Sequence, residues 1–202
     1  MEYQNTDHTF AVCAYKESPY LESCIKSLMS QTVKSNIIVC TSTPCEFIEN
    51  MAKKYNLAYY VKEGKSDICD DWNFAVECTE TNYVTVAHQD DVYNEYYVEE
   101  MLKRIPDDKM SIFIVDYLPL KGGKVGKRDI NSKLRKVLRQ PMRVKKLANS
   151  KWWRRRILSL GNCICCPGVT YNKKVVGKPI FTSEMKFCID WDTFLKCAEI
   201  KD

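Results

Sequence analysis

No run of apolar residues in this chain of 202 residues approaches the ~20 needed to cross a bilayer as a helix. The start, Met1-Glu2-Tyr3-Gln4-Asn5, does not have the pattern of a secretory signal peptide. Internal repeats and low-complexity linkers are also missing, as is a Gly-rich phosphate loop after the first predicted strand. These absences exclude a membrane-spanning protein and a repeat array. They lead us to expect a cytoplasmic protein.

The composition fits one globular domain. At 45% hydrophobic residues, the chain can bury one sizeable core. Its eleven cysteines are odd in number and irregular in spacing, so we expect small core residues in a reducing compartment rather than disulfides. Cys163, Cys165 and Cys166 are only a weak zinc motif, because no second matching pair is present.

Positive charge is concentrated in one segment. The net charge is +5, but residues 133–156 contain eleven Lys or Arg and no acid. This asymmetry predicts an anionic partner there: phosphate, lipid headgroup or nucleic acid. Within the segment, 151–158 combines Trp152 and Trp153 with cations. We keep three interpretations open: peripheral contact with the inner face of a membrane, contact with a pyrophosphate, or a solvated basic face with the tryptophans in the core.

Short apolar runs alternate with amphipathic ones through the first half of the chain. This alternation predicts an α/β fold with a mostly parallel sheet covered by helices on both faces. The predicted strands are 9–14, 36–41, 57–61, 83–87 and 110–117, with an extended segment at 161–171. Helices are predicted from Ser18-Pro19 to Thr32, from Ser42-Thr43-Pro44, over 68–78, from near Asn94 and over 190–199. The basic segment is predicted to be loop plus one or two helices.

The run from Val84 to Tyr93 is the candidate working centre. A β-branched strand ends there in the adjacent carboxylates Asp90 and Asp91, at the edge where ligands bind in α/β sheets. Two neighbouring carboxylates repel each other unless a cation lies with them, and a hard divalent metal prefers oxygen ligands. The alternative is that the two aspartates cap the following helix.

Taken in order, these residues resemble a family 2 glycosyltransferase with the GT-A (Rossmann-like) fold. The resemblance rests on the Tyr15 turn, the helix ending at Gln31-Thr32, Trp72-Asn73, Asp90-Asp91 and two later motifs, Leu160-Gly161-Asn162 and Ile189-Asp190-Trp191-Asp192. It implies one domain in two parts: a nucleotide-sugar donor half, 1–117, and an acceptor half, 118–202, with the basic segment 133–156. It also implies a metal-dependent, inverting sugar transfer.

The resemblance assigns roles residue by residue. It implies Mn²⁺ or Mg²⁺ held by Asp90 and Asp91, and Asp190 as the general base. Donor-binding residues would be Cys13, Ala14, Tyr15, Glu17, Thr41, Asp71, Trp72, His88, Gln89 and Asp90. Asn162 and Trp191 would face the acceptor, a cell-surface glycan or a lipid-linked molecule. The implied partner is UDP-sugar or another nucleotide-sugar, and no nucleic acid is expected.

Three positions depart from the family pattern. His88 stands where an acid usually begins the metal motif, Cys40-Thr41 replaces the usual acidic pair, and Ile189 precedes Asp190 where an acid is common. Simpler roles also stay open: Asp190 as a helix start beside Asp192, His88 as a buried hydrogen-bonded histidine, and Trp72 as a core residue. The rival functions are nucleotidyl transfer and a non-catalytic nucleic-acid-binding module that uses the basic segment.

Overall fold

A six-stranded sheet forms the centre of the protein in the computed structural model, which describes residues 7–105 and 110–200. The strand order is β3-β2-β1-β4-β8-β5. The strands are β1 (His8–Ala14), β2 (Asn36–Thr41), β3 (Ala58–Val61), β4 (Tyr83–His88), β5 (Ile112–Ile114) and β8 (Val169–Asn172). The N-terminal residues, expected not to be a signal peptide, lie outside the described part of the chain.

The sheet is mixed but mainly parallel, as predicted. β1 pairs in parallel with β2 and β4, and β2 pairs in parallel with β3. β8 runs antiparallel to both β4 and β5. The parallel pairing brings the carboxyl ends of β1, β2 and β4 to one edge, with Cys13 opposite Cys40 and His88. The residues that follow β1, β2 and β4 therefore lie close together at this edge of the sheet.

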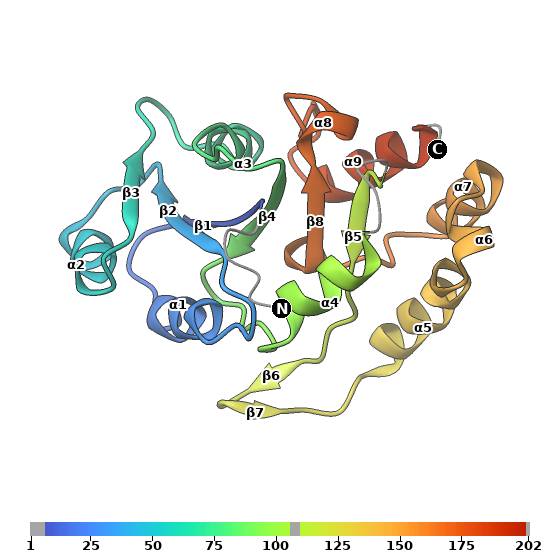
Figure 1. The fold of residues 1–202 in the computed structure, drawn as a ribbon, viewed down its shortest axis with the longest axis horizontal. Coiled ribbons are helices and arrows are strands. Elements are labelled where there is room, and N and C mark those ends of the chain that lie inside the picture. The colour runs from blue at the N-terminus through green and yellow to red at the C-terminus, as the bar shows by residue number, and fades with distance from the viewer. Residues whose placement is uncertain (1–6, 106–109, 201–202) are drawn as a thin grey trace.

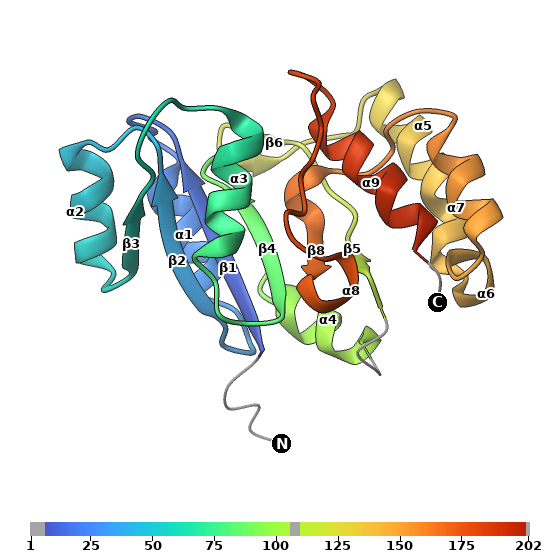
Figure 2. The same cartoon turned by 90° about the horizontal axis from the view of Figure 1, so that it is seen from above.

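Helices cover both faces of the sheet (Figures 1 and 2). The bounds are α1 (Leu21–Met29), α2 (Glu46–Lys54), α3 (Ile68–Glu77), α4 (Tyr97–Arg104), α5 (Ile130–Arg139), α6 (Lys145–Ala148), α7 (Lys151–Leu158), α8 (Lys173–Val176) and α9 (Ile189–Glu199). Two 3₁₀ helices, η1 (Gln140–Arg143) and η2 (Cys166–Gly168), and a hairpin of β6 (Leu120–Lys121) and β7 (Lys124–Val125) complete the assignment. None of these helices is long and apolar enough to cross a membrane.

Alternating side chains of the central strands build two separate cores. Phe10 and Val12 of β1 pack with residues of α1, α2 and α4, whereas Ala11 between them packs with residues of α3, α7 and α9. This alternation follows from the two-residue period of a strand. Burial on both faces explains why the strands read as continuous apolar runs rather than as alternating patterns.

Several element boundaries differ from the sequence predictions. Helix α1 begins at Leu21 rather than at Pro19, because Ser18 closes a turn by accepting the backbone N–H of Leu21. Helix α2 begins at Glu46, two residues after Pro44, and β5 is limited to three residues. The basic segment, predicted to be loop with one or two helices, folds into α5, η1, α6 and α7 at one end of the molecule (Figure 1).

All eleven cysteines are free thiols. Cys163 and Cys166 are buried and Cys165 is half-buried, and burial raises the pKa of all three thiols. Among the residues that the structure describes, no cysteine belongs to a group with metal-binding geometry. The expectation that cysteines serve as core residues is confirmed for the five that are buried, whereas five others are half-buried and Cys188 is exposed.

Candidate active site at the sheet edge

Asp90 and Asp91 lie in the turn directly after β4. The backbone N–H of Asp91 donates to the carbonyl of His88 at 3.2 Å, which closes this turn. Helix α4 begins only at Tyr97, and its N-cap residue is Tyr96. The alternative that the two aspartates cap the next helix is therefore wrong, because five residues separate Asp91 from the first turn of that helix.

His88 joins the two aspartates in a compact group of three. One potential ligand atom from each of the three side chains lies within 4.8 Å of the others. The His88 Nδ1 to Asp91 Oδ2 distance is 4.0 Å. Partial burial and the charge of Asp90 raise the pKa of Asp91 to about 6. Burial is the larger of these two causes, and the neighbouring carboxylate of Asp90 adds to it.

The environment of His88 favours the neutral imidazole. Burial lowers the pKa of His88, while Asp90 and Asp190 raise it by a smaller amount. The ring stacks on Trp72, with 5.2 Å between ring centroids and 25° between planes. Its Nε2 atom is buried and has no hydrogen-bond partner among the described residues, so His88 is not the fully hydrogen-bonded core histidine of the simpler interpretation. A neutral imidazole beside two carboxylates is a suitable donor set for a divalent cation.

Asp190 lies in the first turn of α9. Asn162 Nδ2 donates to Asp190 Oδ2 at 2.8 Å, and the backbone N–H of Trp191 donates to Oδ1 at 2.8 Å. Its charge also raises the pKa of His88 and of Cys166, in each case by less than burial changes it. Two residues on, Asp192 pairs instead with Lys196 at 2.6 Å. Asp190 itself is not paired with a cation among the described residues, and its two hydrogen bonds come from Asn162 and from the backbone of Trp191.

The loops after β1 and β4 are joined by one side chain. Gln89 Oε1 accepts the backbone N–H of Tyr15 at 3.1 Å, and Gln89 Nε2 donates to the carbonyl of Tyr15 at 2.8 Å. The ring of Tyr15 is exposed, as is Glu17. Of the other predicted donor residues, Ala14 and Thr41 are buried and Cys13 is half-buried at the strand ends.

Asp71 reaches from α3 to the end of β2. Ser42 Oγ donates to Asp71 Oδ2 at 2.6 Å, Ser66 Oγ donates to the same oxygen at 2.9 Å, and Lys62 Nζ lies 3.1 Å from Oδ1. These three partners were not predicted from the sequence. They come from separate segments, and a local pattern carries no signal that would have found them. A carboxylate thus stands beside Thr41 although the usual acidic pair after β2 is missing.

Two predicted aromatic residues have structural contacts. Trp72 packs edge-on against Phe181 as well as stacking on His88. Phe181 is held by Asn73, whose Oδ1 accepts the backbone N–H of Phe181 at 3.0 Å. Trp191 Nε1 donates to the carbonyl of Leu158 at 3.0 Å, which ties α9 to α7.

The family of the chain follows from comparison with known proteins. The family model of Glycosyl transferase family 2 matches residues 9–165, which include both the acidic turn and Asn162. The chain belongs to glycosyl transferase family 2. No curated protein matches it in sequence.

Several solved structures have the same fold as this family 2 domain. TarS of S. aureus in complex with UDP-GlcNAc has a TM-score of 0.66 and 16% identity, over 95% of this chain and 53% of that chain. The mannosyltransferase PcManGT of Pyrobaculum calidifontis, in complex with GDP-Man and Mn²⁺, has a TM-score of 0.66 and 13% identity, over 95% and 52%. Glucosyl-3-phosphoglycerate synthase of Mycobacterium tuberculosis, with Mn²⁺ and UDP-Glc, has a TM-score of 0.59 and 14% identity, over 96% and 67%.

At these identities the likeness shows the fold, and it confirms the GT-A prediction for this family 2 domain. The chain spans about half the length of the TarS 1–349 structure and of PcManGT, and 33% of the longer TarS structure.

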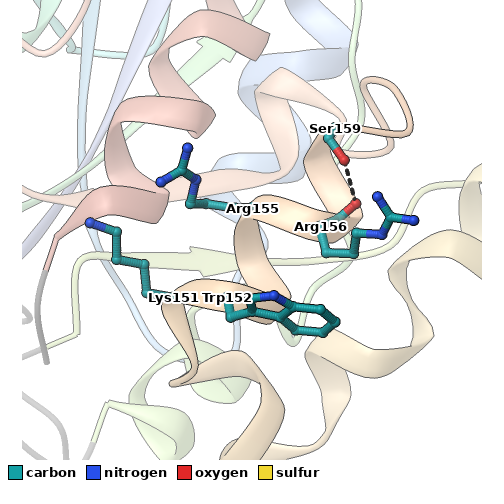
Figure 3. A pocket seen from close by; sticks show the side chains of 5 residues that line it. All are labelled: Lys151, Trp152, Arg155, Arg156 and Ser159. Atoms are coloured by element: carbon teal, nitrogen blue, oxygen red, sulfur yellow. Dashed lines mark hydrogen bonds between the residues drawn. The ribbon is translucent and has the colours of Figure 1, made fainter.

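A separate pocket lies on the basic segment of the family 2 domain. It has a volume of about 630 Å³ and is lined by Lys151, Trp152, Arg155, Arg156 and Ser159 of α7 and the residue after it (Figure 3). Trp152 is 64% exposed and Trp153 is 36% exposed, so the interpretation that folds the two tryptophans into the core is wrong. Lys151 and Arg155 pair with Glu199 of α9 at 2.6 and 3.1 Å, which neutralises part of the charge of α7.

Proposed function

We propose that this chain is the catalytic domain of a metal-dependent, inverting glycosyltransferase that moves a sugar from a nucleotide-sugar to an acceptor hydroxyl. The observation that carries the proposal is the compact group of His88, Asp90 and Asp91 at the end of β4 in a family 2 domain, with the charge of Asp190 acting on His88. Structures of the same fold hold UDP-GlcNAc, GDP-Man with Mn²⁺ and UDP-Glc with Mn²⁺. Those ligands support a nucleotide-sugar as the donor class.

Asp90 and Asp91 are the proposed ligands of Mn²⁺ or Mg²⁺, with the imidazole of His88 within reach of the same ion. Bound there, the ion would supply Lewis-acid stabilisation of the negative charge that develops on the departing diphosphate. The raised pKa of Asp91 supports this assignment, because a nearby cation would relieve the repulsion between the carboxylates.

The donor nucleotide would lie along the ends of β1 and β2. Tyr15 and Glu17 are exposed there, Thr41 ends β2, and Asp71 and Trp72 approach from α3. Gln89 fixes the Tyr15 loop relative to the acidic turn, so the nucleoside and the diphosphate would be held in one geometry. Cys13, Ala14 and the Asp90 carboxylate complete the proposed donor site.

Asp190 is the proposed general base. One of its oxygens would take the proton of the acceptor hydroxyl as that oxygen attacks the anomeric carbon, while the bond from the carbon to the diphosphate breaks. A single displacement of this kind inverts the anomeric centre. Asn162 and the backbone of Trp191 fix the orientation of the carboxylate. Water must be kept out during this step, and we assign that task to residues 121–156.

The acceptor is proposed to bind the 118–202 half, near Asn162 and Trp191, and to be a cell-surface glycan or a lipid-linked molecule. The cytoplasm, with peripheral contact at the inner face of a membrane, stays the predicted location. Contact of residues 151–158 with lipid or with diphosphate is likewise a prediction.

A thermal-shift screen of nucleoside diphosphates and nucleotide-sugars, with and without Mn²⁺, tests the donor and the metal together. A ligand that binds the folded state raises Tm according to its concentration relative to Kd. Asp190→Asn should keep that metal-dependent shift and lose transfer by about 10²-fold or more. Asp192→Asn, on the same helix but paired with Lys196, is the matched control and should keep transfer. Transfer by Asp190→Asn at the normal rate would refute the base assignment.

Two rival functions make different predictions. Nucleotidyl transfer would release pyrophosphate from a nucleoside triphosphate. A nucleic-acid-binding module would bind RNA or DNA in a salt-dependent way and would not turn over nucleotide-sugars. No specific observation in the described structure favours either rival over sugar transfer.

A further inference from the structure

Helix α5 is attached to the protein by a buried cation. Arg139, only 7% exposed, donates to Asp116 and to the carbonyl of Cys163. Asp116 also accepts from Arg128 at 2.9 Å, and Arg139 lies over the ring of Tyr117, 5.8 Å from its centroid. Leu138 packs partly against the core nearby. The side of α5 that faces the protein is therefore centred on a charged residue.

The opposite side of α5 is aliphatic and exposed. Ile130, Leu134 and Val137 share one face, since they follow the i, i+4, i+7 spacing of a helix. They are 83%, 56% and 65% exposed. Ile130 and Arg139 are nine residues apart, about two and a half turns, so they point in opposite directions. An amphipathic helix that buries its charge and exposes its aliphatic face is oriented for a contact outside the chain described.

The exposed charges on the remainder of this helix are positive, and the charge of Arg135 also acts on Asp129. Lys133, Arg135 and Lys136 are exposed, and none of them forms an ion pair within the described part of the chain. Asp129, at the start of α5, is used as the helix cap and accepts the backbone N–H of Ser132 at 2.7 Å. An aliphatic stripe with cations beside it matches a surface that is apolar inside and anionic at its boundary.

We infer that α5 binds an anionic lipid surface, with Ile130, Leu134 and Val137 inserted below the headgroups and Lys133, Arg135 and Lys136 at the phosphate level. This contact on α5 is separate from the one predicted for α7, where Lys151 and Arg155 are paired with Glu199. Lipid is favoured over a protein partner because exposed cations without salt bridges in the described chain accompany the apolar stripe. The inference does not depend on the proposed sugar transfer.

Flotation of the purified chain with lipid vesicles tests the inference directly. Vesicles of phosphatidylcholine with phosphatidylglycerol should carry the protein, and vesicles of phosphatidylcholine alone should carry much less. Leu134→Ser should lower the partition coefficient about tenfold, since a buried leucine side chain contributes more than the tenfold equivalent of free energy. The double variant Lys133→Gln, Lys136→Gln should also bind less, and its loss should shrink as salt is raised.

The matched control is Met29→Ser at the end of α1, which removes an apolar side chain that is 41% exposed on another helix. It should float like the wild type. Leu134→Ser should keep the wild-type Tm because its side chain touches solvent; a large loss of Tm would show that Leu134 is packed within the protein and would overturn the inference. Ile130→Ser gives a second, independent measurement of insertion.

Three other results would also overturn it. Equal flotation of Leu134→Ser and wild type would mean that only the cations act. Absence of flotation with anionic vesicles would exclude lipid as the occupant. A concentration-dependent dimer in light scattering that Leu134→Ser abolishes would show that a second copy of the chain covers this face.

Discussion

The most informative perturbation is a change of pH from 5 to 7 at the His88–Asp90–Asp91 group. A metal ion binds the deprotonated carboxylate, so a proton on Asp91 competes with the metal. With a pKa of about 6, roughly a tenth of Asp91 is ionised at pH 5 and roughly nine tenths at pH 7. The affinity for Mn²⁺ should therefore rise about tenfold over this interval. Protonation of His88 competes with Mn²⁺ only at lower pH, because burial lowers the pKa of His88.

The same pKa gives the metal-free protein a pH dependence of opposite sign. The folded state holds a proton on Asp91 up to about pH 6, whereas the unfolded chain releases it near 3.8. The free energy of unfolding should thus fall as pH rises from about 4 to about 6. Because the side chain is 44% exposed, solvent screening limits this contribution to about 1 kcal/mol. Saturating Mn²⁺ should abolish this decrease in the free energy of unfolding.

Calorimetric titration with Mn²⁺ at pH 5, 6 and 7, together with urea unfolding at the same pH values, measures both effects. Asp91→Asn should bind Mn²⁺ weakly and with little dependence on pH in this range. Asp192→Asn, whose carboxylate is paired with Lys196, should behave as the wild type. The reasoning is refuted if wild-type affinity is the same at pH 5 and pH 7, or if Asp91→Asn retains the slope.

Two further predictions concern stability and donor binding. His8 is fully buried, its Nε2 lies 2.9 Å from Thr85 Oγ1, and burial lowers its pKa to about 3. The unfolded chain takes up a proton on this histidine near pH 6.5, so the free energy of unfolding of the wild type should fall by about 2–3 kcal/mol between pH 6.5 and 4.5. Urea unfolding measures this loss. If the free energy of unfolding depends on pH equally in the wild type and in His8→Gln, the assignment is contradicted. Gln89→Ala removes both hydrogen bonds to Tyr15 and should raise the Kd of the nucleoside diphosphate roughly tenfold. A calorimetric titration measures this Kd. An unchanged Kd would show that the Tyr15 loop is positioned by other contacts.

Local patterns were sufficient for the parallel half of the sheet. The run 36–41 was predicted as a strand and is β2 without change, because burial on both faces requires continuous apolar residues. Asp90 and Asp91 were predicted at the end of a strand because the apolar run before them stops at these two carboxylates. The helices of the basic segment were not predicted in full, since α5 is fixed by Arg139 bonding to Asp116, twenty-three residues away in sequence.

The candidate site shows the same division between local and distant information. The acidic turn can be read directly, because both carboxylates follow one strand. The partners of Asp71 cannot, because Ser42, Lys62 and Ser66 approach it only once β2, β3 and α3 are packed. Nor does the sequence show that the aliphatic residues of α5 point outward, since an amphipathic pattern specifies two faces but not which of them is buried.

The antiparallel direction of β8 lets separate segments of the chain contact the two proposed substrates. Because β8 runs against β4, the peptide that precedes it, 163–168, lies beside the acidic turn, and the peptide that follows it departs from the other end of the sheet. Changes in the loops after β1, β2 and β4 would alter binding of the proposed nucleotide-sugar, whereas changes in residues 163–168, just before β8, would alter binding of the proposed acceptor. Evolution could therefore exchange one substrate of the proposed reaction while leaving recognition of the other intact.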